Sequence, residues 1–311
     1  MNAMRMGEAL MKSMLCALML FAGAALAQTG APSQRVFSSP EAGAAALVEA
    51  LKANDQAVLR DIVGRRGIDL IGRRERGAEE NPYERFLTAY AQSNKFAFEG
   101  DQKAVLEVGK DAWPFPIPLV KVADGWRFDT QAGEQEVLAR RIGRNELAAI
   151  QVCLAIADAE REYASSAHDK DGVLKYTPRF VSTPGKHDGL YWESVGSEPL
   201  SPLGPFAAAA GVDPAGGRST VQHGPYHGYF FRILTRQGKN AEGGAYSYIA
   251  HGMMIGGFAV LAYPVRYGYT GVKTFLISRD GEVFEKDLGK NTRGIAEKIQ
   301  AFEPDASWKR H

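Results

Sequence analysis

The sequence has little cysteine, no excess of either charge and no long hydrophobic run beyond its first residues. Its two cysteines are Cys16 and Cys153. Cys16 lies in a segment that we expect to be removed, so no intrachain disulfide is expected in the mature chain. Stability must then come from a hydrophobic core, which 45% hydrophobic residues can supply.

The charge balance argues against a nucleic-acid partner. Removing residues 1–27 takes away Arg5, Glu8 and Lys12, so that 37 basic and 36 acidic side chains become 35 of each. Affinity for nucleic acid depends largely on Lys and Arg neutralising phosphates, so none is expected here. A local arginine group is interpreted either as a solvated loop between helices or as a contact for an anionic surface: Arg65, Arg66, Arg73, Arg74 and Arg76.

The first 27 residues are expected to form a secretory signal peptide. Residues 14–26 are almost wholly apolar, and Ala25-Leu26-Ala27 has the small-x-small pattern of a cleavage site. The apolar run is shorter than the roughly 20 residues that span a bilayer. We therefore expect cleavage near Ala27, no retained membrane span, and a soluble periplasmic or secreted protein.

Residues 28–133 are expected to form an N-terminal α+β domain. Ser39-Pro40 and Asn81-Pro82 are start signals for two capped helices, with a short helix around residues 58–63 between them. Helices followed by a small antiparallel sheet resemble the NTF2-like cone by analogy. The strands are expected at residues 103–108, 117–122 and, after a turn at Asp124-Gly125, 126–129.

Residues 134–311 are expected to form a second unit, a long helix followed by an antiparallel β-meander, which gives an α+β fold overall. This order is pilin-like by analogy. The helix is predicted from Glu134 to Ala164 with an interruption near Gly143, and its apolar face is expected to carry Leu147, Ile150, Leu154 and Ala157. The strands are expected at 229–235, 258–263, 273–278 and 283–287, joined by short turns such as Asp280-Gly281, before a final helix with Ile295, Ile299 and Phe302 on one face.

The single cysteine of the mature chain lies beside the apolar face of the predicted helix. A nucleophilic cysteine needs a cationic, partly exposed setting, and no histidine is near Cys153 in sequence. We interpret Cys153 as a buried small hydrophobic residue.

Several strings resemble a family of bacterial exported proteins, domain-of-unknown-function family 2950, over nearly the whole mature chain. The resemblance confers no activity, substrate or catalytic residue and implies export and a globular body. The strings are Trp113–Pro118 (WPFPIP), Arg141–Leu147 (RIGRNEL), Ser182–Trp192 (STPGKHDGLYW), Pro225–Tyr229 (PYHGY) and Met254–Phe258 (MIGGF).

Two patterns are weighed as metal sites. Asp169 and Asp171 precede Gly172, as in the opening of a calcium loop, but the first and twelfth loop positions would fall on Ala167 and Pro178. The alternatives are a calcium ion bound by Asp169 and Asp171 and an Asp-rich turn without metal; no cofactor is otherwise expected.

A zinc site is the second pattern, formed by His223 and His227 with His187 and Asp188 as further ligands. Three-residue spacing brings two histidines to one face only on a helix, whereas Gly224 and Pro225 break helices. The sequence favours a loop.

The segment from Ser182 to Trp192 is weighed as a catalytic loop. Ser182 or Thr183 would be the nucleophile, with Lys186 or His187 as base, but no nucleophile elbow or S-x-x-K motif accompanies them. The alternative is a rigid loop whose Tyr191 and Trp192 pack against the meander.

Two classes of function follow. The leading hypothesis is a non-enzymatic cell-envelope protein that binds a protein or cell-wall partner through the aromatic loops of the second unit, with Tyr191, Trp192 and Tyr226 as binding residues. The alternative is an envelope hydrolase using His187, Asp188 and His227, which requires those side chains to converge in one pocket. Tyrosines of the meander either line a groove for sugar or peptide or cover the sheet: Tyr226, Tyr229, Tyr246, Tyr248, Tyr263, Tyr267 and Tyr269.

Overall fold

The computed structural model describes residues 34–72, 81–166, 172–194, 196–197, 199–203 and 225–311. The predicted signal peptide at 1–27 and the calcium candidates Asp169 and Asp171 lie outside these residues. Within them the chain forms helices and antiparallel sheets, so the predicted α+β class is confirmed.

Three helices open the chain, and two of them begin where their capping signals predicted. Ser39 Oγ accepts a hydrogen bond from Ala42 N at 3.2 Å, and Asn81 Oδ1 accepts one from Tyr83 N at 3.1 Å, which satisfies amides that lack a partner in the first turn. The middle helix kinks at Gly64 (φ 73°, ψ 165°), directly after the predicted stretch 58–63, and Arg65 lies in a further helical segment beyond the kink and not in a loop. The helices are α1 (Pro40–Lys52), α2 (Gln56–Ile71) and α3 (Pro82–Gln92).

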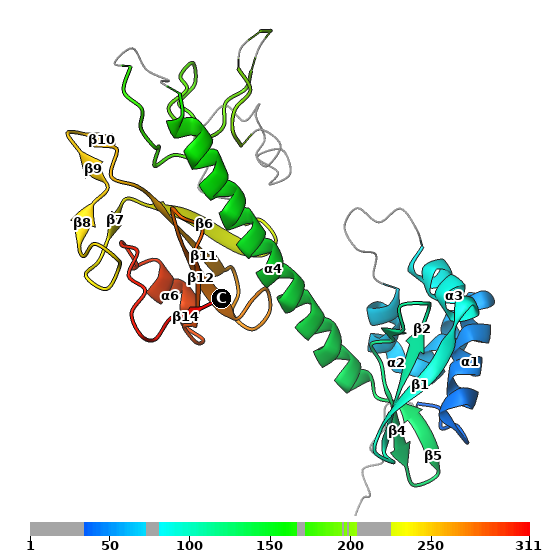
Figure 1. The fold of residues 1–311 in the computed structure, drawn as a ribbon. Coiled ribbons are helices and arrows are strands. Elements are labelled where there is room, and N and C mark those ends of the chain that lie inside the picture. The colour runs from blue at the N-terminus through cyan, green and yellow to red at the C-terminus, as the bar shows by residue number, and fades with distance from the viewer. Residues whose placement is uncertain (1–33, 73–80, 167–171, 195, 198, 204–224) are drawn as a thin grey trace, which may run out of the picture.

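A small antiparallel sheet follows and packs against these helices (Figure 1). Its order is β1-β2-β4-β5, and β3 pairs with β2. The predicted alternation in β2 is confirmed, because Ala104, Leu106 and Val108 are buried and the residues between them are half-buried. The strands are β1 (Asn94–Glu99), β2 (Lys103–Val108), β3 (Trp113–Pro114), β4 (Leu119–Val122) and β5 (Gly125–Phe128).

The helix α4 (Thr130–Ala164) is 35 residues long and joins the two ends of the molecule (Figure 1). It begins four residues earlier than predicted, where Asp129 Oδ1 accepts a hydrogen bond from Ala132 N at 3.0 Å. The predicted interruption near Gly143 is wrong, because the helix runs through this residue. A single glycine costs a helix only about 1 kcal/mol relative to alanine, which packing at both ends of α4 can offset.

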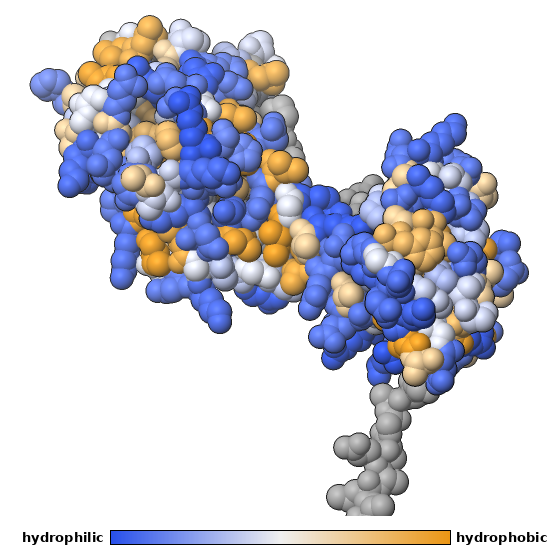
Figure 2. Space-filling model, turned by 60° about the horizontal axis from the view of Figure 1, so that its bottom comes forward, coloured by the Kyte–Doolittle hydropathy of each residue, from blue (hydrophilic) through white to orange (hydrophobic). Residues whose placement is uncertain are grey.

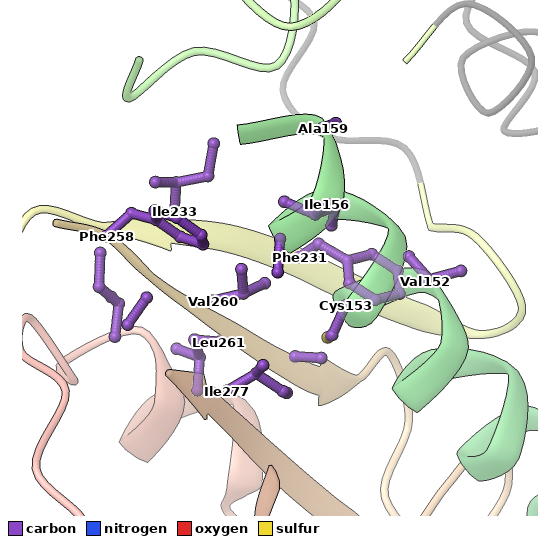
Figure 3. Packing of buried hydrophobic residues seen from close by; sticks show 14 of the residues in the cluster. Val152, Cys153, Ile156, Ala159, Phe231, Ile233, Phe258, Val260, Leu261 and Ile277 are labelled. Carbon is purple, nitrogen blue, oxygen red and sulfur yellow. The ribbon is translucent and has the colours of Figure 1, made fainter. Parts of the chain in front are cut away.

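The buried face of α4 differs from the predicted one. Ile150, Cys153 and Ala157 are buried, but Leu147 is 63% exposed. The helix buries apolar side chains against the second sheet only from about Ala149 onward, and an apolar pattern alone does not show where that burial begins. Figure 3 shows the buried residues of α4 packed against side chains of the sheet.

The second sheet is an antiparallel meander with the order β14-β13-β12-β11-β6. One connection is not a short turn, because the chain between β6 and β11 carries four two-residue strands. The five strands of the sheet are β6 (Tyr229–Leu234), β11 (Ala259–Pro264), β12 (Lys273–Ser278), β13 (Val283–Asp287) and β14 (Lys309–Arg310). The four short ones are β7 (Arg236–Gln237), β8 (Tyr246–Ser247), β9 (Ile249–Ala250) and β10 (Met253–Met254).

The predicted closing helix is only one short helix, α6 (Thr292–Ala296). The shared apolar face expected for it is wrong: Ile295 is exposed, Ile299 is half-buried, and Phe302 is buried after the helix has ended. Phe302 instead forms a parallel bridge with Gln237. The helix is too short to present three residues at helical spacing to one surface.

The buried hydrophobic residues form two separate clusters, one within residues 37–128 and one within residues 149–302. This is compatible with the predicted boundary between 28–133 and 134–311, which stays a prediction. Cys153 is fully buried in the second cluster, and burial raises the pKa of its thiol. Among the helices described, none is long and apolar enough to cross a membrane.

Candidate functional site

The loop from Ser182 to Trp192 uses its hydroxyl groups to hold its own shape. Ser182 Oγ accepts a hydrogen bond from Gly189 N at 2.9 Å and donates one to Gly189 O at 3.2 Å. Thr183 donates from its backbone N to Asp188 Oδ1 at 2.6 Å and from Oγ1 to Asp188 Oδ2 at 2.8 Å. The two hydroxyls weighed as nucleophiles are therefore bonded within the loop.

The carboxylate of Asp188 belongs to this local network. Partial burial acts to raise its pKa, but the two hydrogen bonds from Thr183 and the nearby charges of Arg179 and Lys186 together lower it. Hydrogen bonds to a carboxylate stabilise the charged form. This carboxylate therefore remains ionised and structural, and is poorly suited to act as a general acid.

The aromatic residues of the loop are held against α4 and the second core. The His187 ring stacks on Trp192 at 4.4 Å between centroids, and Tyr163 Oη donates to His187 O at 2.8 Å. Trp192 is buried and donates from Nε1 to Pro199 O at 3.0 Å. Tyr191 is partly buried against the same core. This packing is what the packed-loop alternative expects, and Trp192, which is buried, offers little free surface to a ligand.

His227 lies at the start of β6, next to the half-buried Tyr226. The adjacent Gly228 lies against Asn145 of α4, since a methyl group added at Gly228 would lie 2.9 Å from Asn145 Nδ2. The backbone oxygen of His187 instead accepts a hydrogen bond from Tyr163 of α4. Asn145 and Tyr163 are 18 residues apart on α4, or about 27 Å at the helical rise per residue. The structure thus places His227 far from His187 and Asp188, and the convergence that the hydrolase hypothesis requires is not found.

No cluster of three or more His, Cys, Asp or Glu side chains in the described part of the chain could hold a metal ion. His223, Asp169 and Asp171 lie outside that part. Calcium binding by Asp169 and Asp171 stays a prediction.

An open pocket with basic walls, the basic pocket, lies at the end of β11 and measures about 470 Å³. One wall is the chain that follows β11, and the other comes from the start of α6 and the residues before it. Three of its side chains are cationic: Arg266, Lys290 and Arg293. The lining is completed by Pro264, Val265, Tyr267 and Gly268.

Side chains of α4 hold the loop that forms the first wall. Asn145 Nδ2 donates to Thr270 O at 2.8 Å, and Glu146 Oε1 accepts from Val272 N at 2.8 Å and Lys273 N at 2.9 Å. The loop also turns back on itself, since Gly268 N donates to Gly271 O at 2.9 Å. The loop that forms the first wall of the basic pocket is therefore anchored on α4.

A projecting arm, formed by β7, β8, β9, β10 and the following residue Ile255, lies beside the second sheet (Figure 1). Its exposed apolar side chains are Tyr246 (43%), Ile249 (40%) and Ile255 (46%). The turn between β9 and β10 places His251 and Gly252 at φ 51° and 77°, as a two-residue type I′ hairpin turn requires. Figure 2 shows hydrophobic and hydrophilic residues interspersed over both bodies of the molecule, with more hydrophobic ones on the larger body.

A family model for proteins of unknown function, DUF2950, matches residues 34–311. The chain belongs to the DUF2950 family. Comparisons with curated proteins and with solved structures found no match, so the NTF2-like and pilin-like analogies remain analogies.

The strings that resemble the DUF2950 family lie at junctions of the fold. Trp113 contacts Arg140 of α4, Asn145 and Glu146 hold the loop after β11, and Gly228 packs beside Asn145. Gly256 lies close to the backbone of Tyr248. In this DUF2950 chain the strings therefore include many residues that connect elements of the fold.

Sequence reasoning missed the basic pocket in this DUF2950 chain. Its cations come from two segments, one with Arg266 and one with Lys290 and Arg293, and neither matches a binding motif. The available local signal was Arg266-Tyr267-Gly268-Tyr269, an arginine among aromatic and turn residues. Only the pairing of β11 with β12 and of β12 with β13 brings the two segments together.

Proposed function

We propose that the protein is exported, is cleaved near Ala27 and acts as a non-enzymatic cell-envelope protein whose second unit binds cell-wall material. The observation that carries this proposal is the basic pocket, a concave surface with three cationic side chains. Concave sites with a few converging polar groups are the usual form of ligand sites. The hydroxyl and carboxylate groups weighed for catalysis form hydrogen bonds within their own loop.

Co-sedimentation with purified insoluble cell wall tests this function. The processed chain is expected in the pellet at low salt and in the supernatant at high salt, because salt screens attraction between exposed charges. Release of soluble fragments from the wall during incubation would contradict a non-enzymatic role. A chain that stays in the supernatant at low salt would contradict wall binding.

A protein partner is the second candidate, and the projecting arm favours it. Exposed apolar groups such as Ile249 and Ile255 become favourable contacts once a partner removes them from water. A photoreactive residue at Ile249 is expected to give one discrete adduct in cells, with none from Lys110 in the first unit. Ile255→Asp should abolish the adduct, and an equal adduct from both positions would reject the arm as a specific surface.

A further inference from the structure

We propose that the basic pocket binds a phosphorylated sugar, with Arg266 and Lys290 contacting the phosphate and Tyr267 contacting the sugar. This inference rests on the proposed function and names one ligand class for it. The volume of the basic pocket, about 470 Å³, lies in the range of about 300–1,000 Å³ that is usual for small-molecule sites.

The charge around the pocket favours an anion. Two acidic side chains lie nearby. Glu297 Oε1 accepts from the Arg293 cation at 2.8 Å, whereas Asp287 accepts from two neutral donors, Tyr267 Oη at 3.2 Å and Gly289 N at 2.7 Å, and keeps its negative charge. In the described part of the chain, no acidic side chain pairs with Arg266 or Lys290. Two cations are therefore available to an anion.

Neighbouring residues hold Arg266 in place. The Arg266 guanidinium lies over the Tyr269 ring, with Cζ 3.6 Å from the ring centroid, and Arg141 of α4 lies 4.8 Å from the same centroid. Arg266 N also donates to Thr270 Oγ1 at 3.0 Å, which fixes the turn that carries it. An arginine held in place loses less conformational entropy when it binds, and its planar fork matches two phosphate oxygens.

Tyr267 offers a surface on which a sugar ring can pack. Tyr267 is half-buried in the pocket wall, and its hydroxyl is anchored on Asp287. A tyrosine ring offers an apolar body beside a polar tip, and the C–H face of a sugar ring can pack on such a surface while its hydroxyls remain solvated. An inorganic anion alone would make no contact with the Tyr267 ring. The pocket therefore favours a sugar that carries a phosphate, because such a ligand can contact both the cations and this ring.

Isothermal titration of the processed chain with glucosamine 1-phosphate, glucosamine and inorganic phosphate tests the assignment. Glucosamine 1-phosphate is expected to bind at least tenfold more tightly than either of the others. Equal affinity for inorganic phosphate would overturn the sugar contact, and absence of binding by glucosamine 1-phosphate would overturn the proposal.

Charge removal tests the site. Arg266→Gln with Lys290→Gln is expected to weaken binding of glucosamine 1-phosphate at least tenfold. The matched control, Lys110→Gln with Arg127→Gln, removes the same charges from exposed positions of the first unit and should change it less than twofold. An equal loss of affinity in both double variants would show that only the net charge of the protein matters, and would overturn the assignment of the site. If the double variant unfolds, Lys290→Gln alone at this exposed position must still weaken binding several-fold.

Vesicles distinguish the source of the ligand. Binding to lipid A vesicles, and not to phosphatidylcholine vesicles, would support a phosphorylated sugar in a lipid headgroup, whereas binding only of soluble glucosamine 1-phosphate would support a free or polymer-borne one. Wall binding distinguishes failure of the pocket assignment from failure of the proposed function. Cell-wall binding that persists in the Arg266/Lys290 variant would overturn the pocket and leave the proposed function, and loss of all wall binding by the unmodified chain would overturn the proposed function itself.

Discussion

Arg140 and Arg141 are neighbours on α4, yet their guanidinium groups lie over aromatic rings that belong to the two different sheet regions. Arg140 Cζ is 5.1 Å from the centroid of Trp113 in β3, and Arg141 Cζ is 4.8 Å from the centroid of Tyr269 after β11. Successive helical residues point about 100° apart, so one turn of helix can contact both. The helix is continuous through the point at which it contacts both regions.

The continuity of α4 at Gly143 leads to a stability prediction. Apart from its own helix backbone and chain neighbours, no atom of the described residues lies within 4 Å of the position that a Cβ at Gly143 would occupy. Gly143→Ala is therefore expected to raise the free energy of unfolding by about 0.5–1 kcal/mol, because alanine loses less backbone entropy in a helix. Chemical denaturation measures this change.

Gly133→Ala in the same helix is the matched control. A Cβ there would lie 2.8 Å from Ile117 Cγ1 and 3.3 Å from Ile117 Cα, and this overpacking should cost about 1–3 kcal/mol. We expect Gly143→Ala to raise the free energy of unfolding and Gly133→Ala to lower it. Destabilisation by both substitutions would contradict an unstrained helix at Gly143.

The bonds from Glu146 to the loop after β11 lead to a prediction about the basic pocket. Glu146→Ala removes the acceptor for Val272 N and Lys273 N and should lower the free energy of unfolding by about 1–3 kcal/mol. Hydrogen exchange of residues 266–273 should accelerate more than that of β2. Leu147→Ala, at an exposed neighbour, should change neither; unchanged exchange in the Glu146 variant would show that α4 does not hold this loop.

Glu160 leads to a pH prediction. It is buried, Oε2 accepts from Thr177 N at 3.1 Å, and Oε1 has no hydrogen-bond partner in the described part of the chain. Burial raises its pKa from 4.5 to about 8. Between these values the unfolded chain loses the proton and the folded chain keeps it, so the stabilisation present below pH 4.5 is lost as the pH rises toward 8. The contribution is at most about 1.4 kcal/mol per pH unit.

Denaturation curves between pH 5 and 8 check this slope. The folded protein should become less stable across this window, and Glu160→Gln, which cannot ionise, should flatten the dependence. Glu162→Gln, at an exposed position on the same helix, should leave it as in the unmodified chain. Parallel curves for the unmodified chain and the Glu160 variant would show that Glu160 is already ionised in the folded state.

The bonds between Asp188 and Thr183 lead to the last prediction. Asp188→Asn replaces a charged acceptor of two hydrogen bonds and should lower the free energy of unfolding by about 1–2 kcal/mol. Because the pKa of Asp188 is lowered, its contribution is present above the unfolded pKa of about 3.9 and is lost as the pH falls. His227→Asn, which suits φ 47°, should be nearly neutral. A catalytic role would instead reduce an activity without affecting stability.

Features set by a few neighbouring residues could be predicted from the sequence. Ser39 and Asn81 cap helices because a side-chain oxygen next to free amides needs no distant partner. The alternation in β2 and the strand β12 could be read for the same reason. The predictions for Gly143 and Leu147 were wrong because both depend on where α4 contacts other parts of the chain.

By itself, the sequence determined the α+β class, the start of two helices, the order of the meander strands and the burial of Cys153, since propensity, capping and apolar periodicity are local properties. Only the tertiary structure decided the rest. It separated His227 from His187 and Asp188 along α4, and it brought Arg266 beside Lys290 and Arg293 in one pocket. The physical reason is that long-range strand pairing and helix packing set the distances between segments, and no short stretch of sequence carries those distances.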